Sequence, residues 1–194
     1  MISNVCKIEK GTNDLAEILL ESEKVAVYNG LDKKQSLQLR LICEEIDGML
    51  PKIIGDFNGD FWIEFNKGVC KVNVCIDIPE LNKNKKEELI KVSKSNKNAL
   101  AVGIVGKIRS VIEDFFLTEK AGVLFDASSG EFSSSTGINF SYIWTLNGYK
   151  ENATNEATET WDELEKSIIA NLADDVIVGV KGKKATIVVI KNFK

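Results

Sequence analysis

The sequence predicts an α+β protein, a two-layer sandwich in which helices pack on one face of a mixed, mainly antiparallel sheet. Apolar residues recur at helical spacing in the range 13–53, whereas they alternate with polar residues in the range 61–78. A second pair of apolar runs, 176–180 and 185–190, surrounds Gly182 as a closing hairpin. Helices grouped early and strands arranged in hairpins are typical of this layered architecture.

Composition favours one cytoplasmic domain over residues 1–194, without an internal repeat. The net charge is −4 and the pI is near 5.1. Sequence-independent binding of nucleic acid requires a basic surface, so these values argue against it. No apolar run is long enough to cross a bilayer, and residues 1–7 lack the layout of a secretion signal. We therefore expect no nucleic-acid partner and no membrane association.

The absence of histidine excludes whole classes of site. A His-based catalytic triad, a His-ligated zinc and a phosphorylated histidine all require that side chain. The four cysteines show no C-x-x-C spacing, and Cys70 and Cys75 would face opposite sides of one strand. Reduced, structural thiols are expected, and no metal site.

The first expected helix is capped by Thr12 or Asn13. Its apolar positions include Leu15 and Val25, and Asn29-Gly30 supplies its end.

The second expected helix starts at Asp32, where Gln35 completes a capping box. Pro51 removes a backbone donor, so we expect a kink or an end near Leu50. The buried stripe of this helix comprises Leu39, Ile42, Ile46, Met49, Leu50 and Ile53.

A β-hairpin is expected next. Asn58-Gly59 is predicted as the turn before it, and residues 66–68 as the turn inside it. The second strand presents Asn73 and Asp77 on a solvated face, and Pro79 closes it. The buried face of the hairpin comprises Phe61, Ile63, Phe65, Cys70, Val72, Val74, Ile76 and Ile78.

The second half of the chain is less regular. The expected elements are a short polar helix at 85–93, a longer helix from Asn98 past Phe115, a loop at 126–137, a strand at 138–144, a polar connection at 147–158 and a helix from Thr160 to Leu172. Thr160 and Glu163 form its capping box. Residues 118–158 are interpreted as an insertion or variable region.

The order helix, helix, hairpin, further helices and closing hairpin resembles the histidine-kinase-like ATPase (GHKL) fold. The run 41–49, Leu-Ile-Cys-Glu-Glu-Ile-Asp-Gly-Met, is similar to the nucleotide helix of anti-sigma-factor serine kinases. In that family a glutamate precedes a magnesium-binding asparagine by four residues. The tail from Leu164 to Ile190 is similar to the last helix and two strands of the fold. The resemblance implies a regulatory protein partner, a homodimer, and ATP with magnesium as cofactors.

Glu45 matches the family's catalytic glutamate, which orients or activates the attacking hydroxyl. It lies at the boundary of the apolar stripe, so a glutamate whose stem packs on apolar neighbours is an equal alternative. Met49 stands where the family has asparagine. A soft thioether does not replace a hard oxygen ligand of magnesium, and Asp47 projects from a different side of the helix. The sequence therefore argues against magnesium-dependent phosphoryl transfer.

Three further residues match the family's nucleotide site less well. Asp77 corresponds to the carboxylate that accepts from the adenine amino group, although an exposed position on the hairpin is favoured. Gly103 and Gly106 correspond to the glycine-containing lid that holds phosphates, although helix packing is the favoured reading of both. We expect a degenerate, non-catalytic protein-binding module, with an ATP-binding serine kinase as the alternative. An unrelated metabolic enzyme has no residue constellation in its favour.

Overall fold

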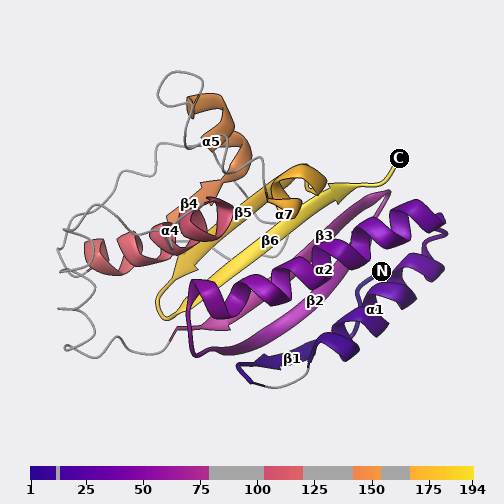
Figure 1. The fold of residues 1–194 in the computed structure, drawn as a ribbon, viewed down its shortest axis with the longest axis horizontal. Helices are drawn as coiled ribbons and strands as arrows, with labels where there is room; N and C mark the ends of the chain where they lie inside the picture. Colours follow the sequence, from indigo (N-terminus) through magenta and orange to yellow (C-terminus); the bar gives the residue numbers. More distant parts are fainter. Residues whose placement is uncertain (12–13, 79–102, 120–141, 154–166) are drawn as a thin grey trace.

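The computed structural model describes residues 1–11, 14–78, 103–119, 142–153 and 167–194. Its centre is a six-stranded sheet with the order β1-β2-β3-β6-β5-β4 (Figure 1). The strands are β1 (Cys6–Glu9), β2 (Asn58–Asn66), β3 (Val69–Asp77), β4 (Tyr142–Thr145), β5 (Asp175–Lys181) and β6 (Lys184–Asn192). Each neighbouring pair among these strands is antiparallel, so the described part of the sheet lacks the parallel component that the sequence predicted.

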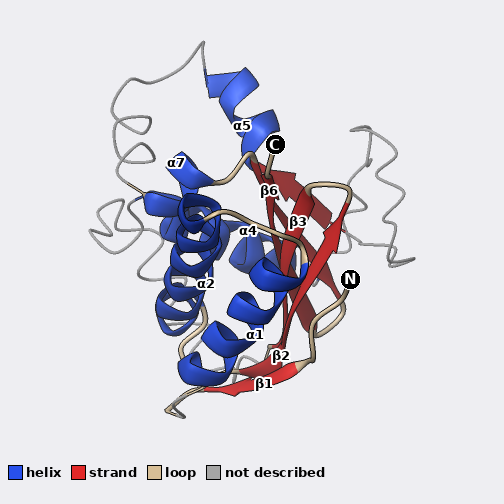
Figure 2. Cartoon of the chain, turned by 90° about the vertical axis from the view of Figure 1, so that its right-hand side faces the viewer, coloured by secondary structure: helices blue, strands red, loops and turns tan. Residues whose placement is uncertain are grey.

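Helices lie against one face of this sheet (Figure 2). They are α1 (Leu15–Tyr28), α2 (Lys33–Ile53), α4 (Gly103–Glu119), α5 (Leu146–Ala153) and α7 (Ile168–Leu172). The long helix α2 contacts α1, α4 and α7, and α4 also contacts β5. The expected α+β architecture, with helices on one side of an antiparallel sheet, is therefore confirmed.

One row of side chains crosses all six strands beneath the helices. The paired positions in this row are Cys6, Phe61, Val74, Ile187, Val178 and Trp144. The first five are buried, because alternate residues of each strand point toward the helix layer. Burying one large apolar side chain contributes about 1.5–3 kcal/mol, so rows of this kind hold the two layers together.

Helix α2 begins as predicted and ends later than predicted. Asp32 accepts from the backbone N–H of Gln35 at 2.7 Å, and the Gln35 side chain accepts from the Asp32 N–H at 3.0 Å. The helix continues through Pro51 to Ile53. Proline removes only its own donor, and the carbonyls of Leu50 and Pro51 accept from the next turn. All six residues of the predicted apolar stripe are buried.

The dipeptide Asn58-Gly59 lies inside strand β2, so its assignment as a turn was wrong. Gly59 pairs with Ile8 of β1 on one side and with Ile76 of β3 on the other. Strand β1 itself was not predicted. Its four residues are too few for the alternation of apolar and polar side chains to indicate a strand. Their pairing also depends on a strand about fifty residues away in the sequence.

The β2–β3 hairpin follows the prediction closely. Lys67 and Gly68 both have positive φ, 49° and 82°, as a tight primed turn requires. The face away from the helices is less exposed to solvent than expected, because Asn73 is buried there beside its cross-strand neighbour Trp62. Strand β3 ends at Asp77, and Pro79 lies outside the described residues.

The start of α1 differs from its prediction. Thr12 and Asn13 lie outside the described residues, and Asp14 immediately precedes the helix. The Asp14 carboxylate does not cap α1 but accepts from the backbone N–H of Glu9 at 2.9 Å. The predicted end is confirmed, because Gly30 adopts a φ of 68° after the last turn.

The second half of the chain brings two corrections. Residues 146–153 form helix α5, where a polar connection was expected, because the Thr145 hydroxyl accepts from the Gly148 N–H and starts a helical turn. Ser167 is extended and caps α7, so the predicted helix does not run continuously into Leu172. The predicted elements at 85–93 and 126–137, the first part of the strand at 138–144, the start of the helix at Asn98 and the capping box at 160–163 lie outside the described residues.

Within the described segments, no helix combines the length and apolar character that crossing a bilayer requires.

Candidate functional site

Glu45 lies on α2 at the edge of its buried face. The capping box at Asp32 fixes where this helix starts and therefore which residues face the sheet. Glu45 is half-buried next to the buried Ile46, as its place in the apolar stripe predicts. The neighbouring Glu44 turns elsewhere and accepts from Arg40 Nε at 3.0 Å. Both glutamates are half-buried, and they differ in that Glu44 has an ion-pair partner on its own helix.

Met49 lies one turn beyond Glu45 and belongs to the core. Its side chain is only 2% exposed, within the apolar cluster between α2 and the sheet. Asp47 lies on the side of α2 that faces Asp14. Burial raises the pKa of Asp47 above its ordinary value, and the nearby Asp14 charge adds to this effect. The oxygen ligand that magnesium needs next to Glu45 is thus supplied by neither residue.

Asp77 is the last residue of β3 and is exposed. Its Oδ1 atom lies 3.5 Å from Nζ of Lys184, its cross-strand partner on β6. An exposed pair of this kind contributes little stability, so the carboxylate can exchange Lys184 for another partner. The favoured prediction, an exposed position at the end of the hairpin, agrees with this placement.

Gly103 and Gly106 lie in the first turn of α4. Gly103 has a φ of 74°, a conformation that favours glycine, and Gly106 is buried. Because α4 packs against α2 and β5, a glycine on its inner side allows close approach. Arg109, one turn further, donates through Nε to Glu113 Oε1 at 2.7 Å. The structure thus places the two glycines and Glu45 on adjacent packed helices and Asp77 at the end of a strand.

No metal site is formed where residues are described, since no three Asp, Glu or Cys side chains gather there in a suitable cluster.

The sequence analysis missed a buried carboxylate, that of Glu21 in α1. It is 4% exposed and accepts from the backbone N–H of Asn4 at 3.0 Å and from Lys24 Nζ at 2.6 Å. Glu21 stands three residues after Ile18 and four before Val25, both buried. This spacing on the apolar stripe was the available signal.

Comparison with protein-family models, with curated proteins and with solved structures gives no match to this chain.

Proposed function

We propose that this chain is a regulatory protein-binding module with a degenerate histidine-kinase-like ATPase site, similar to anti-sigma-factor serine kinases but non-catalytic. The burial of Met49 supports this proposal most directly. The family's magnesium-binding asparagine would stand there, one turn from Glu45, whereas here a thioether fills the core. Without this oxygen ligand, the charge that develops on a transferred phosphoryl group has no metal to neutralise it.

The environment of Asp77 supports the same conclusion. Its carboxylate lies exposed beside Lys184, and no glycine follows it in Ile78-Pro79-Glu80. A close approach of the backbone to a bound nucleotide is therefore harder here than in the family's Asp-x-Gly-x-Gly motif.

The test is thermal unfolding with ATP or ADP, each with and without magnesium, at millimolar concentration. A site with micromolar Kd would gain more than ~2.7 kcal/mol by mass action at such concentrations, which corresponds to several degrees in Tm. We expect no change in Tm in any of the four conditions. A rise with MgATP that Asp77→Asn abolishes would contradict the proposal.

Asp60→Asn is the matched control for Asp77→Asn. Asp60 lies on the same hairpin and pairs with an exposed lysine of the adjacent strand, Lys7. Loss of a nucleotide effect in both variants would indicate a general charge effect and not a site at Asp77.

The alternative function is an ATP-dependent protein serine kinase, favoured by the half-buried position of Glu45 at the border of the core. It predicts phosphate transfer from ATP to a serine of an antagonist protein. Glu45→Gln would abolish this transfer, and Glu44→Gln, the matched neighbour paired with Arg40, would leave it intact. We expect no transfer from the unmodified chain.

The resemblance also suggests partners. We propose a sigma factor or its antagonist as the bound regulatory protein, and a homodimer as the assembled form. Titration of the chain with either protein in a calorimeter tests the first point, and sedimentation velocity tests the second.

A further inference from the structure

Strand β1 forms one edge of the sheet and pairs only with β2 in the described sheet order. The backbone N–H of Lys10 donates to the Phe57 carbonyl at 3.1 Å, and Ile8 and Cys6 follow at two-residue intervals. Because bonding alternates along an antiparallel strand, the backbone groups of Lys7 and Glu9 point away from β2. An edge of this kind is a template to which another strand can add.

The edge also carries exposed apolar side chains. Ile2 is 68% exposed and Val5 is 54% exposed, both beside the first paired residues of the chain. Apolar side chains along an unpaired edge increase the tendency of a second chain to add there. A fold with such an edge therefore needs a feature that prevents a second chain from pairing with it.

Two carboxylates occupy this edge, one from Asp14 immediately before α1 and one from Glu21 within it. Asp14 Oδ2 accepts from the backbone N–H of Glu9 at 2.9 Å. Glu21 Oε2 accepts from the backbone N–H of Asn4 at 3.0 Å, and its Oε1 accepts from the Asn4 side chain at 3.1 Å. Asp14 and Glu21 stand seven residues apart, which is two helical turns, so both project from the same side of α1.

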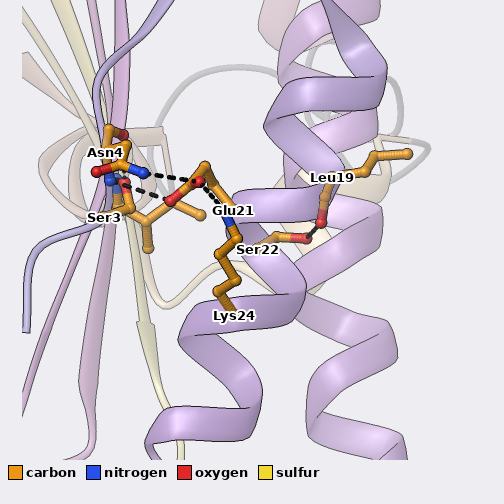
Figure 3. A network of polar contacts seen from close by, with 7 residues as sticks. Ser3, Asn4, Leu19, Glu21, Ser22 and Lys24 are labelled. Carbon is orange, nitrogen blue, oxygen red and sulfur yellow. Dashed lines mark hydrogen bonds and ion pairs between the residues drawn. The ribbon is translucent and has the colours of Figure 1, made fainter.

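The Glu21 carboxylate is buried and has several partners. Its carboxylate is almost fully buried and also binds Nζ of Lys24, as Figure 3 shows. Next to it the strand changes register, because Ile2 pairs with Glu64 whereas Cys6 pairs with Phe61. The register change interrupts the regular edge, and two of its N–H groups already have partners. Few backbone groups between Asn4 and Glu9 can therefore pair with an incoming strand.

We propose that Asp14 and Glu21 close the β1 edge against addition of a strand from a second copy of this chain. The two carboxylates occupy the N–H of Glu9, at the end of β1, and that of Asn4, two residues before its start. Within β1 this leaves the outward backbone groups of Lys7 for an incoming strand. This inference stands independently of the proposed function.

The test compares two double variants by sedimentation velocity over a wide concentration range. Asp14→Ala with Glu21→Ala opens both ends of the edge. Glu17→Ala with Glu23→Ala is the matched control, since it removes the same charge from exposed positions of the same helix. We expect the first variant to self-associate at least tenfold more strongly than the control. Equal behaviour of the two variants would overturn the proposal.

A third variant identifies the surface involved. Lys7→Pro, added to the open-edge variant, removes the outward N–H and leaves the backbone bonds to β2 in place. It also removes the exposed ion pair between Lys7 and Asp60 of β2, so Lys7→Ala in the same background is its control. We expect Lys7→Pro to reduce self-association to the level of the Glu17→Ala with Glu23→Ala control variant. Association that persists in this variant would place the contact on another surface and overturn the proposal.

Amide exchange provides a readout that depends less on stability. In Asp14→Ala alone, the Glu9 amide should exchange at least tenfold faster, while amides of β3 stay protected. Since Asp14 lies outside the core, this single variant remains informative if the double variant fails to fold. Unchanged exchange at Glu9 would show that Asp14 does not protect the edge and would overturn its assigned role.

Discussion

Gly59 of β2 lies directly against the backbone of Cys75 on β3. A Cβ atom at position 59 would stand 2.2 Å from the Cys75 carbonyl oxygen and 2.9 Å from the Ile76 Cα atom. Both contacts are with backbone atoms of a central strand, which has little freedom to move. The absence of a side chain at this position is therefore a condition for pairing β2 with β3.

Gly59→Ala should destabilise the protein by about 2 kcal/mol or more, in the upper part of the range for overpacking. Urea unfolding at equilibrium measures this change. Gly48→Ala is the matched control, because a Cβ at this exposed position of α2 meets nothing within 4 Å. The control should stabilise the protein by about 0.5–1 kcal/mol through helix propensity. Similar effects at both positions would contradict the steric explanation.

Met49→Asn tests whether the position of Met49 can accept a polar side chain. The variant introduces the asparagine that anti-sigma-factor serine kinases carry at the position that Met49 resembles, and it buries an amide in an apolar cluster. We expect a loss of about 2–4 kcal/mol in the free energy of unfolding, since the methionine packing disappears and the amide lacks partners. Met49→Leu keeps the volume and should cost less than about 1.5 kcal/mol. Equal stability of both variants would show that the site has room for a polar group.

The parts of the fold that sequence predicted best are those with local causes. The capping box of Asp32 and Gln35 joins residues three apart, and the turn at Lys67-Gly68 is set by its own dihedral angles. The apolar stripe of α2 follows from helical period alone. These features need no knowledge of the rest of the chain.

The errors have causes that are distant in sequence. Asn58-Gly59 has the composition of a turn, yet pairing with β1 and β3 on either side extends it. The turn preference of this dipeptide is overridden by its backbone pairing with both neighbouring strands. Glu21 was overlooked for a similar reason, because its partner Asn4 lies on a segment that had not been predicted to pair. At the candidate site, sequence placed Glu45 and Met49 correctly relative to the core, but their chemistry depends on partners that it does not encode locally.

Thiol reactivity should separate the four cysteines. Cys6, Cys43 and Cys70 are fully buried, whereas Cys75 is partly exposed on the other face of the sheet. Burial, with smaller contributions from Glu17 and Glu21, raises the pKa of Cys6 to about 11. Burial also raises the pKa of Cys70 to about 12 and that of Cys43 well above its usual range.

Because the thiolate is the reactive form, one thiol should react rapidly with an aromatic disulfide reagent in the native protein. All four should react after unfolding. Cys75→Ser should remove the rapid reaction, and Cys70→Ser, a buried control, should preserve it. Rapid reaction of a second native thiol would contradict the assigned burial.

Two carboxyl groups should change stability with pH in opposite directions. Burial acts to raise the pKa of Glu21, but bonds from Lys24 and Asn4 outweigh it and hold this pKa below 4.5. Its stabilisation is therefore present above about pH 4.5 and is lost as pH falls through the lower native pKa. Asp47 has a pKa raised above 3.8, chiefly by burial, so it destabilises the native state progressively as pH rises above that value.

Glu21→Gln and Asp47→Asn, compared with the parent chain by urea unfolding between pH 3 and pH 7, test these signs. At pH 7 Glu21→Gln should lose about 1.5–3 kcal/mol, the contribution of hydrogen bonds to a charged group, and this loss should shrink as pH falls below 4.5. Asp47→Asn should be more stable than the parent at pH 7, and the gain should vanish in acid, where the parent carboxyl is also neutral. Parallel pH profiles for the parent and either variant would show that the substituted carboxyl does not carry the assigned linkage. A Glu21→Gln profile that diverged further from the parent in acid would reverse its sign, and the Asn4 contact would then stabilise the protonated form.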